Sequence, residues 1–445
     1  MQENKMGVMP INKLLITMSL PMIISMLVQA LYNIVDSVFV AQISENALTA
    51  VSLAFPAQNL MIAFAGGTAV GVNALLSRSL GEKNLERVTK TANISIILGL
   101  LNSALFLVLA LLFHNIFFSV QTTDPEIIKY GSQYVLVVLG CSIGIFMQFT
   151  FERLLQATGR TMHTMFTQGL GAIINIILDP IMIFGWFGFP AMGVTGAALA
   201  TVIGQIIAAL LALFLNLKYN HDITLSLKKF TFDFHIIKQI YTVGVPSIIM
   251  QSIGSVMTFG MNTILITFST TATAVFGIYF KLQSFVFMPV FGLNNGMIPI
   301  IAYNFGAKQK ERLMETIRLS AIYAVGMMII GFLAFEIFPK ELLLLFNASD
   351  HMIEIGVPAL RIIALHFLFA GFCIVCGSVF QALGKGVLSL INSITRQLLV
   401  LLPVAYALSL FGDINYVWIS FPIAEIASLV VSTFFLKKVI KQLHI

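Results

Sequence analysis

Long apolar runs separated by short polar segments dominate the chain. They lie at about residues 14–42, 50–77, 92–117, 130–152, 165–187, 193–217, 239–268, 275–302, 313–338, 357–381, 387–410 and 414–436. Each run exceeds the roughly 20 residues that a helix needs to cross the hydrocarbon core of a bilayer. The pattern predicts an all-α polytopic membrane protein with 12 transmembrane helices.

Composition supports this class. Hydrophobic residues make up 58% of the 445 residues and charged residues only 10%, whereas soluble domains carry about 25% charged residues. A soluble core could not bury so much apolar surface. We therefore expect a multi-pass protein of the cell membrane.

Most Lys and Arg residues fall on one side of the predicted bundle. The loops on the opposite side receive only Lys129 and Lys340. Because positively charged loops stay in the cytoplasm, both termini are expected there and the number of spans is even. This placement explains the net charge of +6 without nucleic-acid binding. The cations assigned to the cytoplasmic side include Arg78, Arg87, Arg153, Lys228, Lys229, Lys308, Arg312, Arg396 and Lys441.

The two halves of the chain repeat each other at an offset of 225 residues. The matching landmarks are Leu80–Arg87 with Phe305–Arg312, Gln156–Arg160 with Gln381–Lys385, Pro21 with Pro246, and Gly67 and Gly71 with Gly292 and Gly296. We expect two six-helix lobes, residues 1–217 and 239–445, joined by a cytoplasmic linker at 218–238. Six spans per lobe make the repeats parallel, with a cavity between them.

A polar stripe crosses the first apolar run. Gln29, Tyr32, Asn33 and Asp36 follow i, i+3, i+4, i+7 spacing and share one helix face. An Asp at the centre of a membrane helix costs about 2.5–3.5 kcal/mol to insert. A buried helix contact would explain the stripe, but intramembrane carboxylates more often mark ion or substrate paths.

The fifth run carries a second carboxylate at a similar depth. Asn175 and Asp179 lie on one helix face, and Pro180 follows them. With Asp36 they form a plausible site for either a shared proton or Na⁺, and Thr195 is expected to add a hydroxyl. Alternatively, Asp179 only hydrogen-bonds near a kink at Pro180.

The repeat restricts this site to one lobe. At the offset of 225, Asp36 corresponds to Met261 and Asp179 to Val404. We therefore expect ion coupling in the first half alone.

Other polar residues in the apolar runs are weaker candidates for a substrate cavity. They are Lys281, Asn294, Asn295 and Glu425, which add to the stripe residues. The 38 Phe and 21 Met residues suit a cavity that adapts to apolar cations.

Several function classes are excluded by what the sequence lacks. It contains no GxxxxGK[ST] loop for ATP and no His–carboxylate cluster within a run. We expect a monomeric, non-enzymatic protein without cofactors, acting on small cationic molecules. A lipid-linked oligosaccharide flippase is the alternative, but it needs many cavity cations to hold phosphates, and the sequence offers only Lys281 and Arg361.

Five segments together resemble the multidrug and toxic compound extrusion (MATE) transporters over essentially the whole chain. These segments are Leu31–Ser37, Leu80–Asn84, Leu155–Gly159, Asn175–Pro180 and Phe421–Glu425. The resemblance implies two lobes arranged as a V, alternating access, and export of cationic drugs in exchange for H⁺ or Na⁺.

The resemblance also implies where the cation binds. The family's first-lobe cation site corresponds to Asp36, Asn175 and Asp179, with Thr195 as a looser match. The family branch with acidic residues in the seventh and tenth helices is not matched, because those helices carry Gln251, Asn262, Arg361 and His366.

Overall fold

The computed structural model describes residues 4–226, 228 and 230–443, and within these it is helical without strands. Lys229, one of the predicted cytoplasmic cations, lies outside the described residues. The helices are α1 (Lys5–Val8), α2 (Ile11–Ala41), α3 (Glu45–Gly81), α4 (Leu85–Ser119), α5 (Pro125–Gly140), α6 (Ile143–Ala157), α7 (Thr161–Phe184), η1 (Trp186–Gly188), α8 (Val194–Tyr219), α9 (Phe234–Leu265), α10 (Thr270–Gly306), α11 (Lys310–Ile337), α12 (Pro339–Leu344), α13 (Asp350–Ala364), α14 (Phe367–Ala382), α15 (Gly386–Ile394), the π-helix η3 (Thr395–Leu401), α16 (Leu402–Ser409) and α17 (Ile414–Gln442).

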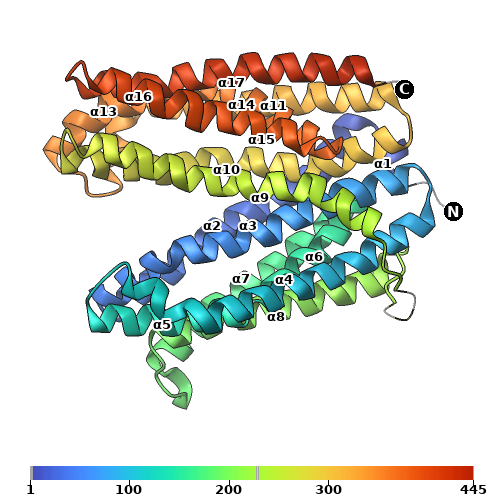
Figure 1. The fold of residues 1–445 in the computed structure, drawn as a ribbon, viewed down its shortest axis with the longest axis horizontal. Helices are drawn as coiled ribbons and strands as arrows, with labels where there is room; N and C mark the ends of the chain where they lie inside the picture. Colours follow the sequence, from blue (N-terminus) through green and yellow to red (C-terminus); the bar gives the residue numbers. More distant parts are fainter. Residues whose placement is uncertain (1–3, 227, 229, 444–445) are drawn as a thin grey trace.

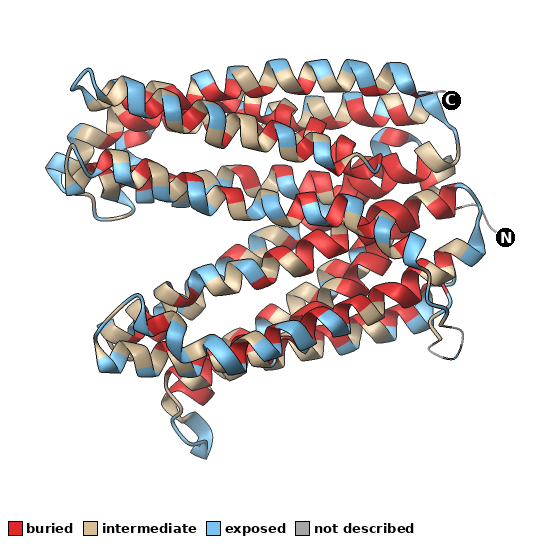
Figure 2. Cartoon of the chain, viewed as in Figure 1, coloured by how far each residue is buried: buried red, intermediate tan, exposed pale blue. Residues whose placement is uncertain are grey.

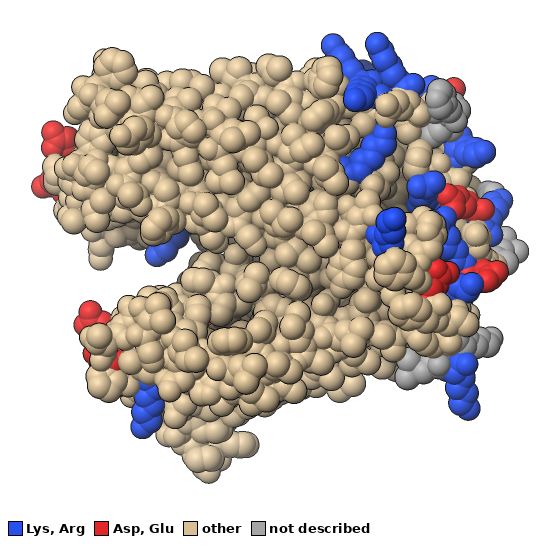
Figure 3. Space-filling view, viewed as in Figure 1, with Lys and Arg blue, Asp and Glu red and all other residues tan. Residues whose placement is uncertain are grey.

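The predicted fold class is confirmed. In the described chain, ten helical segments are long and apolar enough to cross a membrane, and the bent pairs α5–α6 and α13–α14 bring the total to twelve. The helices form two lobes that meet at the end carrying both termini and diverge toward the other end (Figure 1). Figure 3 shows a cleft between the lobes and Lys and Arg side chains gathered at the end with the termini.

The repeat predicted from sequence is also visible in the geometry. α3 and α10 begin and end 225 residues apart, and each starts at a serine N-cap, Ser44 or Ser269, whose side chain accepts a hydrogen bond from a backbone N–H three residues later. The turns that follow these helices contain Lys83 and Lys308, both with φ of 57°. Local backbone conformation thus repeats along with the sequence.

Glycines let the lobes pack closely at the end with the termini. α3 packs on α9 and α10 packs on α2. A Cβ on Gly71 would lie 2.1 Å from the carbonyl oxygen of Ile240, and one on Gly296 would lie 2.7 Å from the Cα of Ser19. Only glycine permits these backbone approaches, which close the apex of the V. Buried residues concentrate there (Figure 2).

Two features of the spans are not predicted by the sequence pattern. The fourth and tenth spans are bent by 41° and 50°, at the breaks after Gly140 and Ala364. Apolar composition continues across both breaks, so hydropathy carries no sign of them. The helices also extend into the predicted 218–238 linker, because α8 ends at Tyr219 and α9 begins at Phe234.

Candidate functional site

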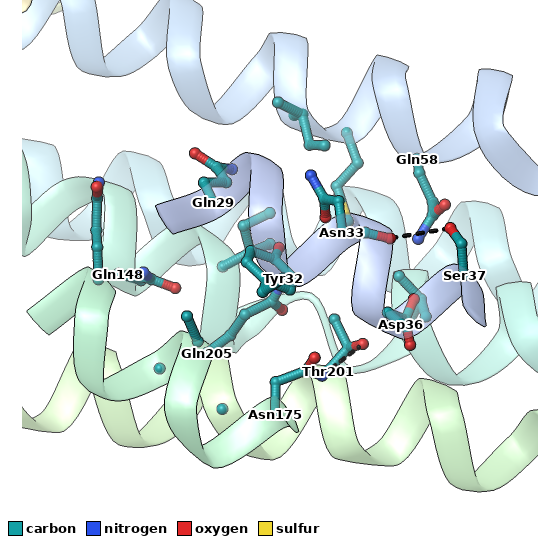
Figure 4. Close-up of a pocket in the computed structure, with 18 of the residues that line it drawn as sticks. Gln29, Tyr32, Asn33, Asp36, Ser37, Gln58, Gln148, Asn175, Thr201 and Gln205 are labelled. Carbon is teal, nitrogen blue, oxygen red and sulfur yellow. Dashed lines mark hydrogen bonds between the residues drawn. The ribbon is translucent and has the colours of Figure 1, made fainter. Parts of the chain in front are cut away.

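The first lobe encloses a cavity of about 500 Å³, which we call the lobe cavity. Its walls come from α2, α3, α5, α6, α7 and α8. All four residues of the predicted polar stripe, Gln29, Tyr32, Asn33 and Asp36, line it from α2, as their helical spacing requires. Figure 4 shows them following one another along α2, with Asn175 and Thr201 on neighbouring helices close to Asp36.

Asp36 and Asp179 form an acid pair where α2 packs against α7. Asp36 lies on the cavity wall, whereas the Asp179 side chain is completely buried behind it, and the two carboxyl groups interact electrostatically. Asp36 Oδ1 and both Asp179 oxygens are buried, and within the described chain no N–H group and no Ser, Thr or Tyr hydroxyl donates to them. The two carboxyl groups lie within hydrogen-bonding range of each other, so a proton on one can be shared with the other. Two neighbouring buried carboxylates repel each other unless a bound proton or cation compensates their charge.

Asn175 extends the site by one helical turn along α7. Its Nδ2 donates to Thr201 Oγ1 at 3.1 Å, and the Thr201 hydroxyl donates to the carbonyl oxygen of Ala197. These bonds orient the amide, and its Oδ1 is left buried without a partner among the described residues. Asp36, Asn175 and Asp179 therefore present four buried oxygens to which no N–H group or Ser, Thr or Tyr hydroxyl of the described chain donates. This is the ligand chemistry of a hard cation or of a shared proton.

The hydroxyl that bonds the Asn175 amide belongs to Thr201 rather than to Thr195. α7 and α8 pack closely, with Gly196 against Met182 and Gly204 against Gly171. Thr195 therefore lies near the level of Met182, seven residues or about 10 Å along the helix from Asn175. Thr195 is half-buried and is not one of the residues that line the lobe cavity.

A second cavity of about 520 Å³, which we call the central cavity, lies between the lobes. Asn294 and Asn295 line it, and Gln29 lines both cavities. Asn295 accepts a hydrogen bond from Arg153 at 3.1 Å, while both polar atoms of the Asn294 amide are buried without a partner in the described residues.

The sequence-based placement of two arginines is wrong. The charge pattern assigns Arg153 and Arg396 to the cytoplasmic side, but both lie within helical spans and line the central cavity. Arg153 also donates to Gln156, at 2.9 Å, and Arg396 pairs with Glu425 at 3.4 Å. α6 continues to Ala157, beyond the predicted run at 130–152, so Arg153 lies on the helix rather than in a loop. Arg396 lies inside the predicted run at 387–410, and its charge alone assigns it to the cytoplasm.

Lys281 and Glu425 are placed differently from the other predicted cavity residues. Lys281 is exposed and its ammonium lies 5.9 Å from the centre of the Phe346 ring. Glu425 is buried behind Arg396. Neither residue lines the lobe cavity or the central cavity.

Sequence reasoning misses Glu152, which lies on α6 and lines both cavities. It sits at the end of a predicted apolar run, where hydropathy makes it indistinguishable from a boundary residue. The repeat gives a signal that could have found it: the matching residue in the second half is Gly377, so the shared scaffold does not require a carboxylate at this position.

Comparison with known proteins places the chain in a family. The MatE family model matches residues 21–181 and again 246–407. These two matches cover most of the chain and start 225 residues apart, at the two prolines that the repeat pairs. The chain belongs to the MatE family. It is therefore an integral membrane transporter rather than an enzyme.

Individual MatE relatives cover nearly the whole chain. The multidrug export protein MepA of Staphylococcus haemolyticus is 28% identical over 422 residues, covering 93% of this chain and 91% of that protein. MepA of Staphylococcus aureus strain MRSA252 is 27% identical over 419 residues, covering 94% and 91%.

Solved structures of MATE transporters share the fold. One described as the outward-facing conformation of a multidrug resistance MATE family transporter superposes with a TM-score of 0.93 at 25% identity, covering 100% of this chain and 99% of that one. A transporter from Pyrococcus furiosus matches equally well, and it is described as having a binding pocket of reverse polarity that suggests a different function. Function within this fold must therefore be argued from the site.

Proposed function

We propose that this MatE protein is a secondary antiporter that exports cationic or amphipathic drugs in exchange for H⁺ or Na⁺. One observation carries the proposal: four acceptor oxygens of Asp36, Asn175 and Asp179 are buried beside the lobe cavity, and no N–H group or Ser, Thr or Tyr hydroxyl of the described chain donates to them. A proton or Na⁺ would satisfy them and neutralise the acid pair. The printed names of the MepA relatives support multidrug export.

The direction of transport follows from the charge distribution. Lys and Arg gather at the end that carries the termini, and positive charge is retained in the cytoplasm. The V then opens to the outside, and the glycine contacts at its apex close the cytoplasmic side. In this state the acid pair would load a cation from outside, which would release a drug held in the lobe cavity.

Alternating access would require the glycine contacts at the apex to separate. The pairs α3–α9, α2–α10 and α3–α10 would part, since they join the two lobes most extensively. Because the two lobes are structural repeats, they could close against each other in the same way at the end opposite the termini.

For the flippase alternative, the structure adds two arginines to the central cavity that the sequence did not predict there, but both already bind other side chains. Arg153 and Arg396 line the central cavity, as a phosphate binder would require. However, Arg153 is held by Gln156 and Asn295, and Arg396 by Glu425. The described lining of the lobe cavity carries the carboxylates Asp36 and Glu152 and no Lys or Arg, which favours cationic substrates.

The test is transport by purified protein in proteoliposomes loaded with a fluorescent organic cation. An imposed inward gradient of protons or of Na⁺ should drive dye export, and the Asp36→Asn variant should show none. Equal dye flux with and without either gradient would contradict the antiport mechanism.

A further inference from the structure

A buried carboxylate lies where the two cavities adjoin, in the region we call the passage, and it is not part of the proposed ion site. Five residues line both cavities: Gln29, Ile62, Phe149, Glu152 and Gln168. Glu152 is the one charged residue of the five, and it is only 3% exposed. Glu152 therefore lies where the two cavities adjoin, and a molecule that crossed this shared wall would come close to its carboxylate.

The hydrogen bonds to Glu152 come from neutral groups. Gln148 donates to Oε1 at 3.0 Å, Thr167 donates to Oε1 at 2.8 Å, and Gln168 donates to Oε2 at 2.8 Å. These bonds fix the carboxylate in position but supply no compensating charge.

The adjacent arginine is directed elsewhere. Arg153 donates to Gln156 and to Asn295 across the lobe interface; it makes no hydrogen bond or ion pair with Glu152 and acts on this carboxylate only through a longer-range electrostatic interaction. A desolvated carboxylate without an ion-pair partner favours a bound cation over a neutral or anionic group.

The surroundings suit an organic cation. The cavities on either side, of about 500 and 520 Å³, fall in the usual range of drug-sized pockets. Phe149 supplies an aromatic ring beside the carboxylate, and Met22, Met26 and Met250 line the central cavity. Aromatic faces and thioethers bind apolar cations of varied shape.

The repeat separates this role from the scaffold. Glu152 corresponds to Gly377, which also lines the central cavity, so the fold does not require a carboxylate at this position. Glu152 is also distinct from the acid pair: Gln29, its neighbour in the passage, lies seven residues before Asp36 on α2, or about 10 Å along the helix.

We propose that Glu152 selects the cationic group of the transported molecule, binding organic monocations such as quaternary or aryl-substituted ammonium ions in the passage between the cavities. This inference rests on the proposed export function and names the substrate class of that function. The role of Glu152 is to bind and discriminate substrate, while Asp36 and Asp179 bind the coupling ion.

The experiment compares two rhodamine dyes that share one ring system: a permanently cationic ester and the zwitterionic free acid. Binding to purified protein is measured by fluorescence polarisation. Glu152→Gln should weaken binding of the cationic ester about tenfold or more, the effect expected for one desolvated charge interaction. Binding of the zwitterion should change much less.

Two further variants isolate the charge. Glu152→Asp keeps the charge and should retain the preference for the ester, although its shorter side chain disturbs the same hydrogen bonds. Glu86→Gln, which removes an exposed carboxylate on α4, should bind both dyes as the wild type does.

Three results would count against the proposal. An unchanged ester-to-acid preference in Glu152→Gln would overturn it, as would an equal loss in Glu152→Asp and Glu152→Gln, which indicates a structural role. Wild-type protein that transports neither dye under a proton or Na⁺ gradient would instead contradict the export function itself.

Discussion

Asp36 and Asp179 interact across the contact between α2 and α7, one on the wall of the lobe cavity and the other fully buried behind it. Neither the sequence spacing nor the repeat brings them together; helix packing does. Their corresponding residues in the second lobe are Met261 and Val404, so the pair is not part of the shared scaffold.

Neutralising either acid should uncouple transport from the ion gradient. With Asp179→Asn, the remaining carboxylate no longer repels a neighbour, and it can stay ionised without recruiting a cation. Gradient-driven dye export in proteoliposomes should fall at least about tenfold while the protein remains folded. The matched control is Glu354→Gln, which removes a carboxylate that is 82% exposed; export equal to that control would contradict the assignment.

The two threonines of α8 offer a direct comparison. Thr201→Val removes the hydroxyl that accepts from Asn175, so the amide loses its orientation and the ion should bind about tenfold more weakly, the cost of roughly one hydrogen bond. Thr195→Val makes the same chemical change about two turns away and should leave affinity unchanged. The ion concentration that gives half-maximal export measures the ion affinity of each variant. A larger effect of Thr195→Val than of Thr201→Val would support the sequence-based assignment of Thr195.

Leucine at Gly296 should open the apex of the V. The added side chain would collide with Ser19 of α2, and overpacking of this kind costs about 1–3 kcal/mol. Spin labels are attached through Glu86→Cys and Glu311→Cys in a background without the native cysteines. The distance between the two labels, measured by pulsed electron paramagnetic resonance, should be longer in Gly296→Leu than in the protein with Gly296. Gly277→Leu is the control on the same helix, because a Cβ added at Gly277 would meet nothing within 4 Å; an equal shift there would rule out the contact as the cause.

The Arg396–Glu425 pair should stabilise the second lobe. Arg396→Met leaves the Glu425 carboxylate, only 3% exposed, without its cation, at a cost of up to about 3 kcal/mol. The melting temperature in detergent should fall. Arg396→Met combined with Glu425→Leu removes both charges and should recover most of the loss, whereas a double variant less stable than the single one would show that the pair has another role.

The sequence predicts the scaffold well because neither of its two strong signals depends on how the helices pack together. Apolar runs longer than a bilayer mark the spans, and the offset of 225 residues marks the lobes. The stripe from Gln29 to Asp36 can also be predicted without knowledge of helix packing, because helical spacing alone puts its members on one face. All four residues line the lobe cavity.

The rest of the site depends on packing between helices. Thr195 and Thr201 are equivalent from sequence, and only the pairing of Gly196 with Met182 shows which one reaches Asn175. Glu152 and Arg153 lie at the predicted end of an apolar run, where hydropathy cannot distinguish a loop charge from a charge on a cavity wall. Arg396 lies inside the run at 387–410, where hydropathy does not show that its side chain lines a cavity. The bends after Gly140 and Ala364 leave hydropathy unchanged.

The most direct test of the antiport mechanism is ion release on substrate binding. Purified protein in weakly buffered detergent is mixed with a saturating organic cation while proton release, or release of radioactive Na⁺, is recorded. Antiport predicts that the wild type releases one of the two ions and that Asp36→Asn releases neither. Release of the same size from Asp36→Asn, or substrate binding by the wild type without release of either ion, would contradict it.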